Sequence, residues 1–235
     1  MKQSTSTDHV GRRTLAGQAI YTKFVLRLYD FIVLTISNRW IWKCPTPILI
    51  NHYDHYLSAN HLDVGVGTGY FLDHGHYPIT SPRIVLFDLN PNTLEYTTQR
   101  IARFAAESHV VNVLEPITLK GLAKFDSVGI NYLIHCLPGA GISDKSVVFD
   151  HLKGLMNDDA TLFGSTILSG DVPRSWMAKR LMAFYNGKGI FSNQYDGLGD
   201  LKVELERRFR EVEIEVFGCV AVFAASRLVD RDNLI

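Results

Sequence analysis

The sequence has no excess of charge of either sign, and this absence argues against two classes of protein. Lys and Arg together number 24, and Asp and Glu also number 24, so the formal net charge at pH 7 is +0. Proteins that bind nucleic acids or anionic membranes usually carry a basic excess or a polybasic run. We therefore expect no nucleic-acid partner and no attraction to an anionic membrane, although a local basic patch is compatible with these totals.

Cysteine is also scarce. The three cysteines, Cys44, Cys136 and Cys219, are far apart in the chain. Their spacing fits neither a metal site nor a redox motif, and a sparse, odd set is typical of free thiols in a reducing compartment. None of the nine histidines is paired with another at a spacing typical of zinc ligands. We therefore expect no bound metal and a cytoplasmic location.

A long uninterrupted apolar run is missing as well. The best candidate for a membrane span, residues 24–42, contains Arg27, Asp30 and Arg39. Far fewer than about 18 uncharged apolar residues remain in a row, so the stretch is interpreted as a buried helix. Residues 1–13 are polar and lack the apolar core of a secretory signal. We expect no membrane insertion.

What the sequence does contain fits one α/β domain, since 46% of its 235 residues are hydrophobic and 20% are charged. Apolar and aromatic residues recur at helical spacings over residues 15–37, which predicts one or two helices. Pro45 and Pro47 indicate the start of another helix, which continues to residue 56. Residues 1–58 are expected to form a leader and a helical lid, and residues 59–235 the core.

From His61 onward, short apolar runs alternate with helical patterns, which is typical of a parallel sheet with helices on both faces. Strands are expected at 61–65, 83–88, 109–113, 125–131 and 159–167. Helices are expected at about 69–76, 91–106, 143–156, 175–185 and 199–209, the third of them with Ser143 as N-cap. Two alternating apolar runs, 211–217 and 220–225, are separated by Gly218 and predict a terminal antiparallel hairpin.

The stretch NHLDVGVGTGYFL, residues 60–72, contains the most informative motif. An apolar strand leads into Gly65, Gly67 and Gly69, and a helix is expected to follow. A strand that turns through glycines into a helix lets a ligand lie against bare backbone N–H groups. The alternative is a glycine-rich turn that binds nothing, because short motifs match by chance.

The spacing of this motif differs from the dinucleotide fingerprint G-x-G-x-x-G. With Asp63 two residues before Gly65, the pattern D-x-G-x-G-x-G resembles motif I of class I S-adenosylmethionine-dependent methyltransferases. A second strand ends at Asp88, about 20 residues farther on, where an acidic ribose ligand is expected. The resemblance implies a doubly wound, mostly parallel seven-stranded sheet, a C-terminal antiparallel hairpin and S-adenosylmethionine as cofactor.

The resemblance also implies roles for individual residues. Asp63 and the backbone of Gly65, Gly67 and Gly69 are expected at the methionine end of the cofactor, and Asp88 at the ribose hydroxyls. Near the adenine we expect Leu89, Asn112 and Val113. Near the sulfonium we expect Asn131, and from the lid Tyr21 and Tyr29. The alternatives are a solvated or backbone-capping role for Asp63, a turn-forming role for Asp88, an Asx turn at Asn112 and a plain aromatic core for the tyrosines.

His135 is the candidate general base, because a neutral imidazole can take a proton from an acceptor as the methyl group moves. The alternative is a histidine that only fixes its loop or binds the cofactor. The segment around it, residues 125–139, resembles small-molecule methyltransferases, including quinone C-methyltransferases and enzymes of secondary metabolism. It lacks the N/D-P-P-Y/F signature of amino-group methylation. Contacts to the acceptor are expected from Trp176, Met177, Met182 and Phe191.

The leading hypothesis is methyl transfer to a small organic acceptor at oxygen, nitrogen or carbon. A cyclase or pericyclase that binds the cofactor without transferring methyl is the alternative, because it requires the same motif. A silent regulatory subunit and a nicotinamide oxidoreductase are the remaining hypotheses. The sequence indicates neither the acceptor nor the oligomeric state.

Overall fold

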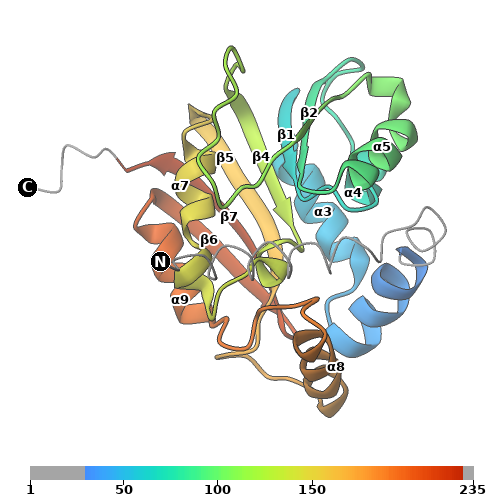
Figure 1. The fold of residues 1–235 in the computed structure, drawn as a ribbon, viewed down its shortest axis with the longest axis vertical. Helices are drawn as coiled ribbons and strands as arrows, with labels where there is room; N and C mark the ends of the chain where they lie inside the picture. The colour runs from blue at the N-terminus through green and yellow to red at the C-terminus, as the bar shows by residue number, and fades with distance from the viewer. Residues whose placement is uncertain (1–29, 230–235) are drawn as a thin grey trace, which may run out of the picture.

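A computed structural model describes residues 30–229, in which a seven-stranded sheet lies between two layers of helices (Figure 1). The strand order is β3-β2-β1-β4-β5-β7-β6. The strands are β1 Asn60–Val64, β2 Arg83–Asp88, β3 Glu107–Val110, β4 Phe125–Asn131, β5 Met156–Ile167, β6 Phe209–Phe217 and β7 Val220–Leu228. The first five are mutually parallel, and β7 runs antiparallel to both β5 and β6. This confirms the predicted doubly wound sheet with its antiparallel C-terminal hairpin.

The helices that cover the sheet differ in length and type. The α-helices are α3 Thr46–Tyr56, α4 Tyr70–His74, α5 Pro91–Arg100, α6 Ile142–Lys145, α7 Val147–Lys153, α8 Trp176–Gly187 and α9 Leu198–Glu206. The π-helix η1 spans Asp30–Trp42, and the short 3-10 helices are η2 Ala102–Phe104 and η3 Ile134–Cys136. No helix within residues 30–229 is long and apolar enough to cross a membrane.

The two faces of the sheet are buried by different helices, because successive strand residues point to opposite sides. Leu62 and Val64 lie in the larger apolar cluster, which is completed by buried residues of α7 and α9. Ile84 and Leu86 lie in a second cluster on the other face, where Tyr53 of α3 is fully buried. The strands are therefore apolar on both sides, which is what a central parallel sheet requires.

Some predicted boundaries were wrong. The third strand was expected at 109–113, but β3 ends at Val110, because the Asn112 side chain accepts the Leu114 N–H at 3.2 Å and turns the chain. The helix expected at 143–156 is divided into α6 and α7 and ends at Lys153, so β5 begins at Met156. Ser143 lies inside α6 and is not its cap. The N-cap is instead Gly141, whose N–H is accepted by the Asp144 carboxylate at 3.4 Å, together with the Ala140 N–H at 2.8 Å.

The N-terminal region is connected to the opposite end of the chain. The Trp42 carbonyl accepts the Cys219 N–H at 3.0 Å, and the Trp42 side chain is only 1% exposed. A Cβ atom at Gly218 would collide with the same carbonyl, so the hairpin turn requires glycine there. Of the helical pattern expected over residues 15–37, only the part from Asp30 onward lies in the described residues.

Candidate active site

The glycine turn after β1 adopts a conformation that other residues rarely take. Gly65, Gly67 and Gly69 have φ angles of 72°, 54° and 69°, all in the left-handed region. The Gly65 N–H donates to the Phe87 carbonyl at 2.7 Å, so the turn is fastened to the neighbouring strand β2. Glycine therefore permits the left-handed backbone of the motif, and the hydrogen bond to β2 holds it in place.

The space around the three glycines differs. A Cβ atom at Gly65 would lie 2.9 Å from the Leu133 side chain, and one at Gly69 would lie 2.7 Å from Thr97 Cγ2. A Cβ atom at Gly67 would meet nothing closer than the Gly65 carbonyl, at 4.0 Å. Two glycines thus allow close packing of the protein on itself, whereas Gly67 leaves room in which a ligand can lie against the backbone.

Asp88 lies at the end of β2 and is half-buried. Its carboxylate accepts the Asn90 N–H at 2.8 Å and is also hydrogen-bonded by the backbone amides of Gly67 and Leu89. Burial raises the pKa of the Asp88 carboxyl to about 6, although the three amides act in the opposite direction. Asp88 thus connects the end of the second strand with the glycine turn of the first.

Asp63 lies on β1 and is 6% exposed. It accepts a hydrogen bond from the Tyr53 hydroxyl at 2.8 Å. Its negative charge also helps to raise the pKa of Asp88, so the two carboxylates lie at the same edge of the sheet. Asp63 is therefore neither solvated nor a backbone cap, which were its alternative interpretations.

The residues expected near adenine are arranged less favourably. Leu89 is half-buried, and Val113 is buried in the larger apolar cluster. The Asn112 amide donates to Glu115 at 2.8 Å, while its oxygen accepts from Leu114. This is the Asx turn given as the alternative for Asn112, and a contact to a ligand would use the second N–H of the amide or replace one of these partners.

Asn131, the last residue of β4, presents an unused hydrogen-bond donor. Its Oδ1 accepts from the Ser165 hydroxyl at 3.1 Å, which fixes the orientation of the amide. Its Nδ2 is buried and has no hydrogen-bond partner within the described part of the chain. A buried donor without a partner costs about 1–3 kcal/mol. A ligand that accepts a hydrogen bond at this point would recover that free energy.

Tyr132 follows Asn131 and has a φ angle of 54°, which is uncommon for a residue with a side chain. Its hydroxyl donates to Asn38 Oδ1 at 2.9 Å, so the end of β4 is joined to the helix η1. Burial raises the pKa of Tyr132 well above its ordinary value. The strained backbone and the buried hydroxyl hold the loop after β4 in one conformation.

His135 is 3% exposed, and its ring packs against Phe191 at 4.5 Å between centroids. Burial, aided by the charge of Lys145, lowers its pKa to about 3, so the imidazole is neutral at pH 7. Its Nδ1 lies 3.3 Å from the Ile167 N–H and accepts from it, so the ring proton resides on Nε2. Neither nitrogen then has a free lone pair for a substrate proton, which fits the loop-fixing alternative better than the predicted base.

A buried ion pair that sequence reasoning missed supports the same loop. Lys145 Nζ lies 2.9 Å from Asp196 Oδ2, and both side chains are 0% exposed. The ammonium also donates to the carbonyls of Ile134 and Ser192 at 3.1 and 2.7 Å. In the sequence, Lys145 looks like an ordinary solvated helix residue, and nothing there pairs it with Asp196.

Tyr53 was missed as well, although a signal for it exists. It follows Leu49 by four residues in a helix whose buried positions are these two, so helical periodicity places it toward the sheet.

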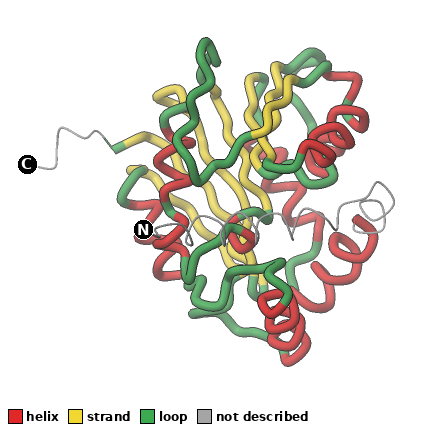
Figure 2. The backbone as a smooth tube through the Cα atoms, viewed as in Figure 1, coloured by secondary structure: helices red, strands yellow, loops and turns green. Residues whose placement is uncertain are grey.

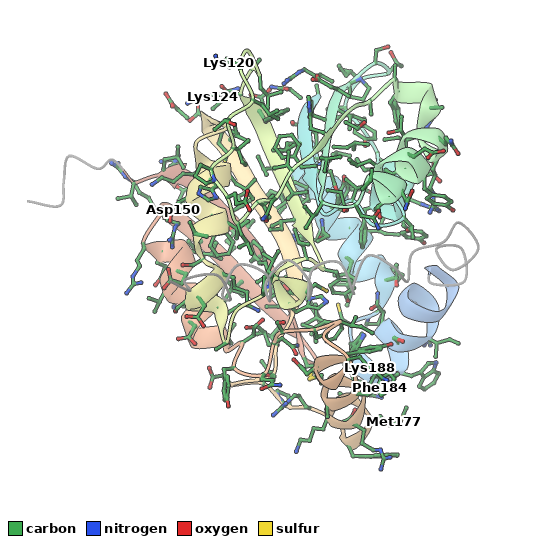
Figure 3. The ribbon with its side chains drawn as sticks, viewed as in Figure 1. Lys120, Lys124, Asp150, Met177, Phe184 and Lys188 are labelled. Carbon is green, nitrogen blue, oxygen red and sulfur yellow. The ribbon has the colours of Figure 1, made fainter. Side chains whose placement is uncertain are left out.

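The four residues expected to contact the acceptor separate into two pairs. Met182 and Phe191 are buried, whereas Trp176 and Met177 are 69% and 41% exposed. Met177 lies on the outer part of α8 (Figure 3). Tyr21 and Tyr29 lie outside the described residues.

The loops that carry these residues gather at the carboxyl ends of the parallel strands, on the side of the sheet nearest α8 (Figure 2). In open α/β sheets this is where ligands bind. Three observations fit an adenosyl cofactor: the open space beside Gly67, the carboxylate of Asp88 and the unused Asn131 donor. Residues 30–229 hold no cluster of three His, Cys, Asp or Glu side chains suited to a metal ion.

The sequence has close relatives over almost its whole length. No protein-family model matches it. It is 39% identical to demethylluteothin O-methyltransferase from Streptomyces thioluteus, over 94% of this chain and 96% of the relative. It is 38% identical to the physcion biosynthesis cluster O-methyltransferase from Aspergillus chevalieri, over 91% and 96%. The fold matches that of the DhpI–SAH complex with a TM-score of 0.68 at 12% identity, over 97% of this chain and 100% of that one. The chain therefore belongs to the family of S-adenosylmethionine-dependent methyltransferases that act on small molecules.

Proposed function

We propose that this enzyme binds S-adenosylmethionine across the ends of β1, β2 and β4 and transfers its methyl group to an oxygen of a small organic acceptor. The observation that carries the proposal is the turn of three glycines with left-handed φ angles, in which the space beside Gly67 is open and its amide is bonded to Asp88. Two relatives of similar length are named as O-methyltransferases, which favours oxygen as the methylated atom.

The cofactor-binding roles follow from the chemistry of each side chain. The ionised Asp88 carboxylate has two oxygens and can accept both ribose hydroxyls. Asp63 would receive the ammonium group of the methionine end, and Asn131 Nδ2 would donate to an acceptor atom of the bound ligands. Leu89 and the backbone at Val113 would contact the adenine, and the Asn112 amide, which has a second N–H besides the one that it donates to Glu115, would donate to it. The bound cofactor supplies a methyl group on a sulfonium, which is an excellent leaving group.

The lid is a further part of this proposal. The hydrogen bond from Tyr132 to Asn38 joins η1 to the end of β4, which supports a cover built by the residues before position 59. Tyr21 and Tyr29 are proposed to belong to it and to face the sulfonium, which aromatic rings attract. A cover of this kind excludes water from the transfer step. Free Cys44, Cys136 and Cys219 also favour a reducing compartment such as the cytoplasm.

The position of His135 restricts the type of acceptor. Because its Nδ1 already accepts a hydrogen bond and its pKa is about 3, it is a poor base at neutral pH. We therefore expect an acceptor whose hydroxyl is acidic enough to ionise without help, such as a phenol or an enol. The enzyme's contribution is then to align the acceptor oxygen with the methyl group and to exclude water.

Incubation with S-adenosylmethionine labelled at the methyl carbon tests the proposal. Phenols and enols are compared with aliphatic alcohols and amines of similar size, and products are identified by mass and position of the label. We expect labelled methyl ethers from the acidic hydroxyl compounds. Labelled amines alone would contradict the choice of oxygen. A transformed acceptor without label would contradict methyl transfer and favour the cyclase alternative.

A further inference from the structure

A line of buried hydrogen bonds crosses the sheet beneath the glycine turn and ends on Asp63. The Ser127 hydroxyl on β4 lies 2.8 Å from His61 Nδ1 on β1. His61 Nε2 lies 3.1 Å from the Tyr53 hydroxyl on α3, and this hydroxyl lies 2.8 Å from Asp63 Oδ2. Four side chains from three elements thus form one continuous chain. We refer to Ser127, His61, Tyr53 and Asp63 as the buried chain.

The direction of the two hydrogen bonds nearest Asp63 follows from the groups present. The Tyr53 hydroxyl donates its only proton to Asp63 Oδ2. The Tyr53 oxygen therefore accepts from His61 Nε2–H. Ser127 holds the other ring nitrogen at 2.8 Å and is itself held by Ser58, whose hydroxyl lies 2.7 Å from the Ser127 hydroxyl. The two donors nearest the carboxylate both point toward Asp63, an arrangement in which each bond strengthens the next.

Packing holds the buried chain in this one arrangement. Tyr53 stacks on Phe71 at 5.6 Å, and Phe163 stacks on His61 at 5.8 Å between ring centroids. Gly129 pairs with Asp63 in the sheet, and a Cβ atom there would lie 3.1 Å from His61 Cε1 and 3.3 Å from Asp63 Oδ2. The absence of a side chain at position 129 makes room for the carboxylate and the imidazole side by side.

The contacts of the buried chain engage only one oxygen of Asp63. Tyr53 donates to Oδ2, and His61 Nε2 lies 3.5 Å from the same atom. Oδ1 is therefore the oxygen that can face a ligand. Because rotation of the carboxylate would break the bond to Tyr53, the buried chain fixes which oxygen is presented and in which direction.

From these contacts we infer that Tyr53 and His61 are positioning residues for the cofactor, which hold Asp63 so that Oδ1 receives the ammonium group. The inference rests on the proposed function, in which Asp63 binds the methionine end. Neither residue touches the cofactor in this scheme. Both act through Asp63, and Ser127 acts one step farther away by holding the His61 ring at Nδ1.

Binding of two ligands that differ only at the methionine end tests the inference. S-adenosylhomocysteine carries the amino acid end, and 5′-methylthioadenosine lacks it. Calorimetric titration of Tyr53→Phe should show affinity for S-adenosylhomocysteine reduced about tenfold or more, with affinity for 5′-methylthioadenosine unchanged, because only the hydroxyl is lost. Ser127→Ala should have the same selectivity with a smaller loss, about twofold to fivefold, because it acts at one remove.

Tyr56→Phe is the matched control, because Tyr56 lies on the same helix but donates to exposed Glu213 at 3.0 Å. It should leave both affinities unchanged. In a double-mutant cycle, Tyr53→Phe should cause no further loss of S-adenosylhomocysteine affinity in an Asp63→Asn background. Thermal unfolding of each variant identifies any that has not folded.

Several results overturn the inference. Equal affinity of Tyr53→Phe and the wild type for S-adenosylhomocysteine removes the positioning role while leaving the proposed function intact. Equal losses for both ligands show a general structural effect instead. Binding of neither ligand to the wild-type protein refutes the proposed cofactor site itself, and the positioning role with it.

Discussion

The ligand edge of the sheet has two halves that are built in different ways. At the ends of β1 and β2, which we call the cofactor half because most of the proposed cofactor contacts lie there, backbone groups make several contacts, as when Gly65 N–H bonds to Phe87 and three amides bind Asp88. At the ends of β4 and β5, which we call the acceptor half because we propose that the acceptor lies there beyond the cofactor, individual side chains bind distant loops. Lys145 alone joins α6 to η3 and to the segment after α8.

This difference indicates which half tolerates change. A site made of backbone depends on conformation, so most substitutions outside the glycines leave it intact. A site held by single buried side chains can change its shape through one substitution, at a cost in stability. The acceptor half should therefore be both the easier half to redesign and the easier half to destroy.

The largest effect is expected in the acceptor half. Lys145→Met leaves Asp196 buried without its cation, which should lower the free energy of unfolding by about 3–5 kcal/mol. Urea denaturation measures the loss. The double variant Lys145→Met, Asp196→Leu should regain most of it, because a buried ion pair contributes little over an apolar pair of similar volume. A loss below about 1 kcal/mol in the single variant would contradict this account of the acceptor half.

In the cofactor half, Asp88→Ala should weaken binding of S-adenosylhomocysteine by about 1–3 kcal/mol, because hydrogen bonds to a charged group are lost. Calorimetry provides the measurement. Asp159→Ala is the control, since Asp159 is exposed and lies at the opposite end of β5 from the site. Unchanged affinity in Asp88→Ala would show that Asp88 does not bind the ribose hydroxyls.

The raised pKa of Asp88, about 6 against an ordinary 3.8, predicts a pH dependence of binding. If the ionised carboxylate accepts the ribose hydroxyls, affinity should fall by up to about tenfold per pH unit below pH 6. Because the folded state binds this proton more tightly than the unfolded state, the stability contributed by Asp88 should decrease as pH rises from about 4 to 6. Asp88→Asn should lack both trends, and calorimetry and urea denaturation across this range compare it with the wild type.

The smallest effect is expected at His135. His135→Asn keeps a hydrogen-bond acceptor near the Ile167 N–H but removes the imidazole, so turnover of a phenolic acceptor should fall less than about tenfold. Loss of a general base would instead lower turnover by about 100-fold or more. Initial rates at saturating cofactor distinguish these two outcomes. A loss of 100-fold would restore His135 as the base and remove our restriction to acidic acceptors.

Local patterns predicted the sheet well, because alternating apolar runs such as Leu62 and Val64 determine strands directly. Boundaries were predicted less well where one side chain decides them. Asn112 ends its strand by an Asx turn, and α6 begins after Gly141, whose N–H bonds to Asp144, rather than after Ser143. Such choices depend on competition between neighbouring hydrogen bonds, which the apolar pattern does not report.

In the candidate site, too, residues in local sequence patterns were predicted and contacts between distant residues were not. Asp63 and the glycines were predicted because their motif is continuous in sequence, and Asp88 because it ends the next strand at the expected spacing; their roles remain proposals. The partners of Lys145 were not predicted, because Asp196 is 51 residues away and the pair forms only when the fold brings α6 and the segment after α8 together. Tyr53 lies only 10 residues before Asp63, yet its hydrogen bond also depends on how α3 lies on the sheet.

The position of β7 has a consequence for biosynthesis. This strand lies between β5 and β6, so on the ribosome the edge of β5 stays unpaired until the last part of the hairpin has emerged. The Trp42 carbonyl likewise cannot accept its hydrogen bond from the Cys219 amide until the 177th residue after Trp42 has been translated. Residues up to Cys219 must therefore be translated before the segment at Trp42 can bond to this hairpin, and until then an exposed strand edge is open to chaperones or to aggregation.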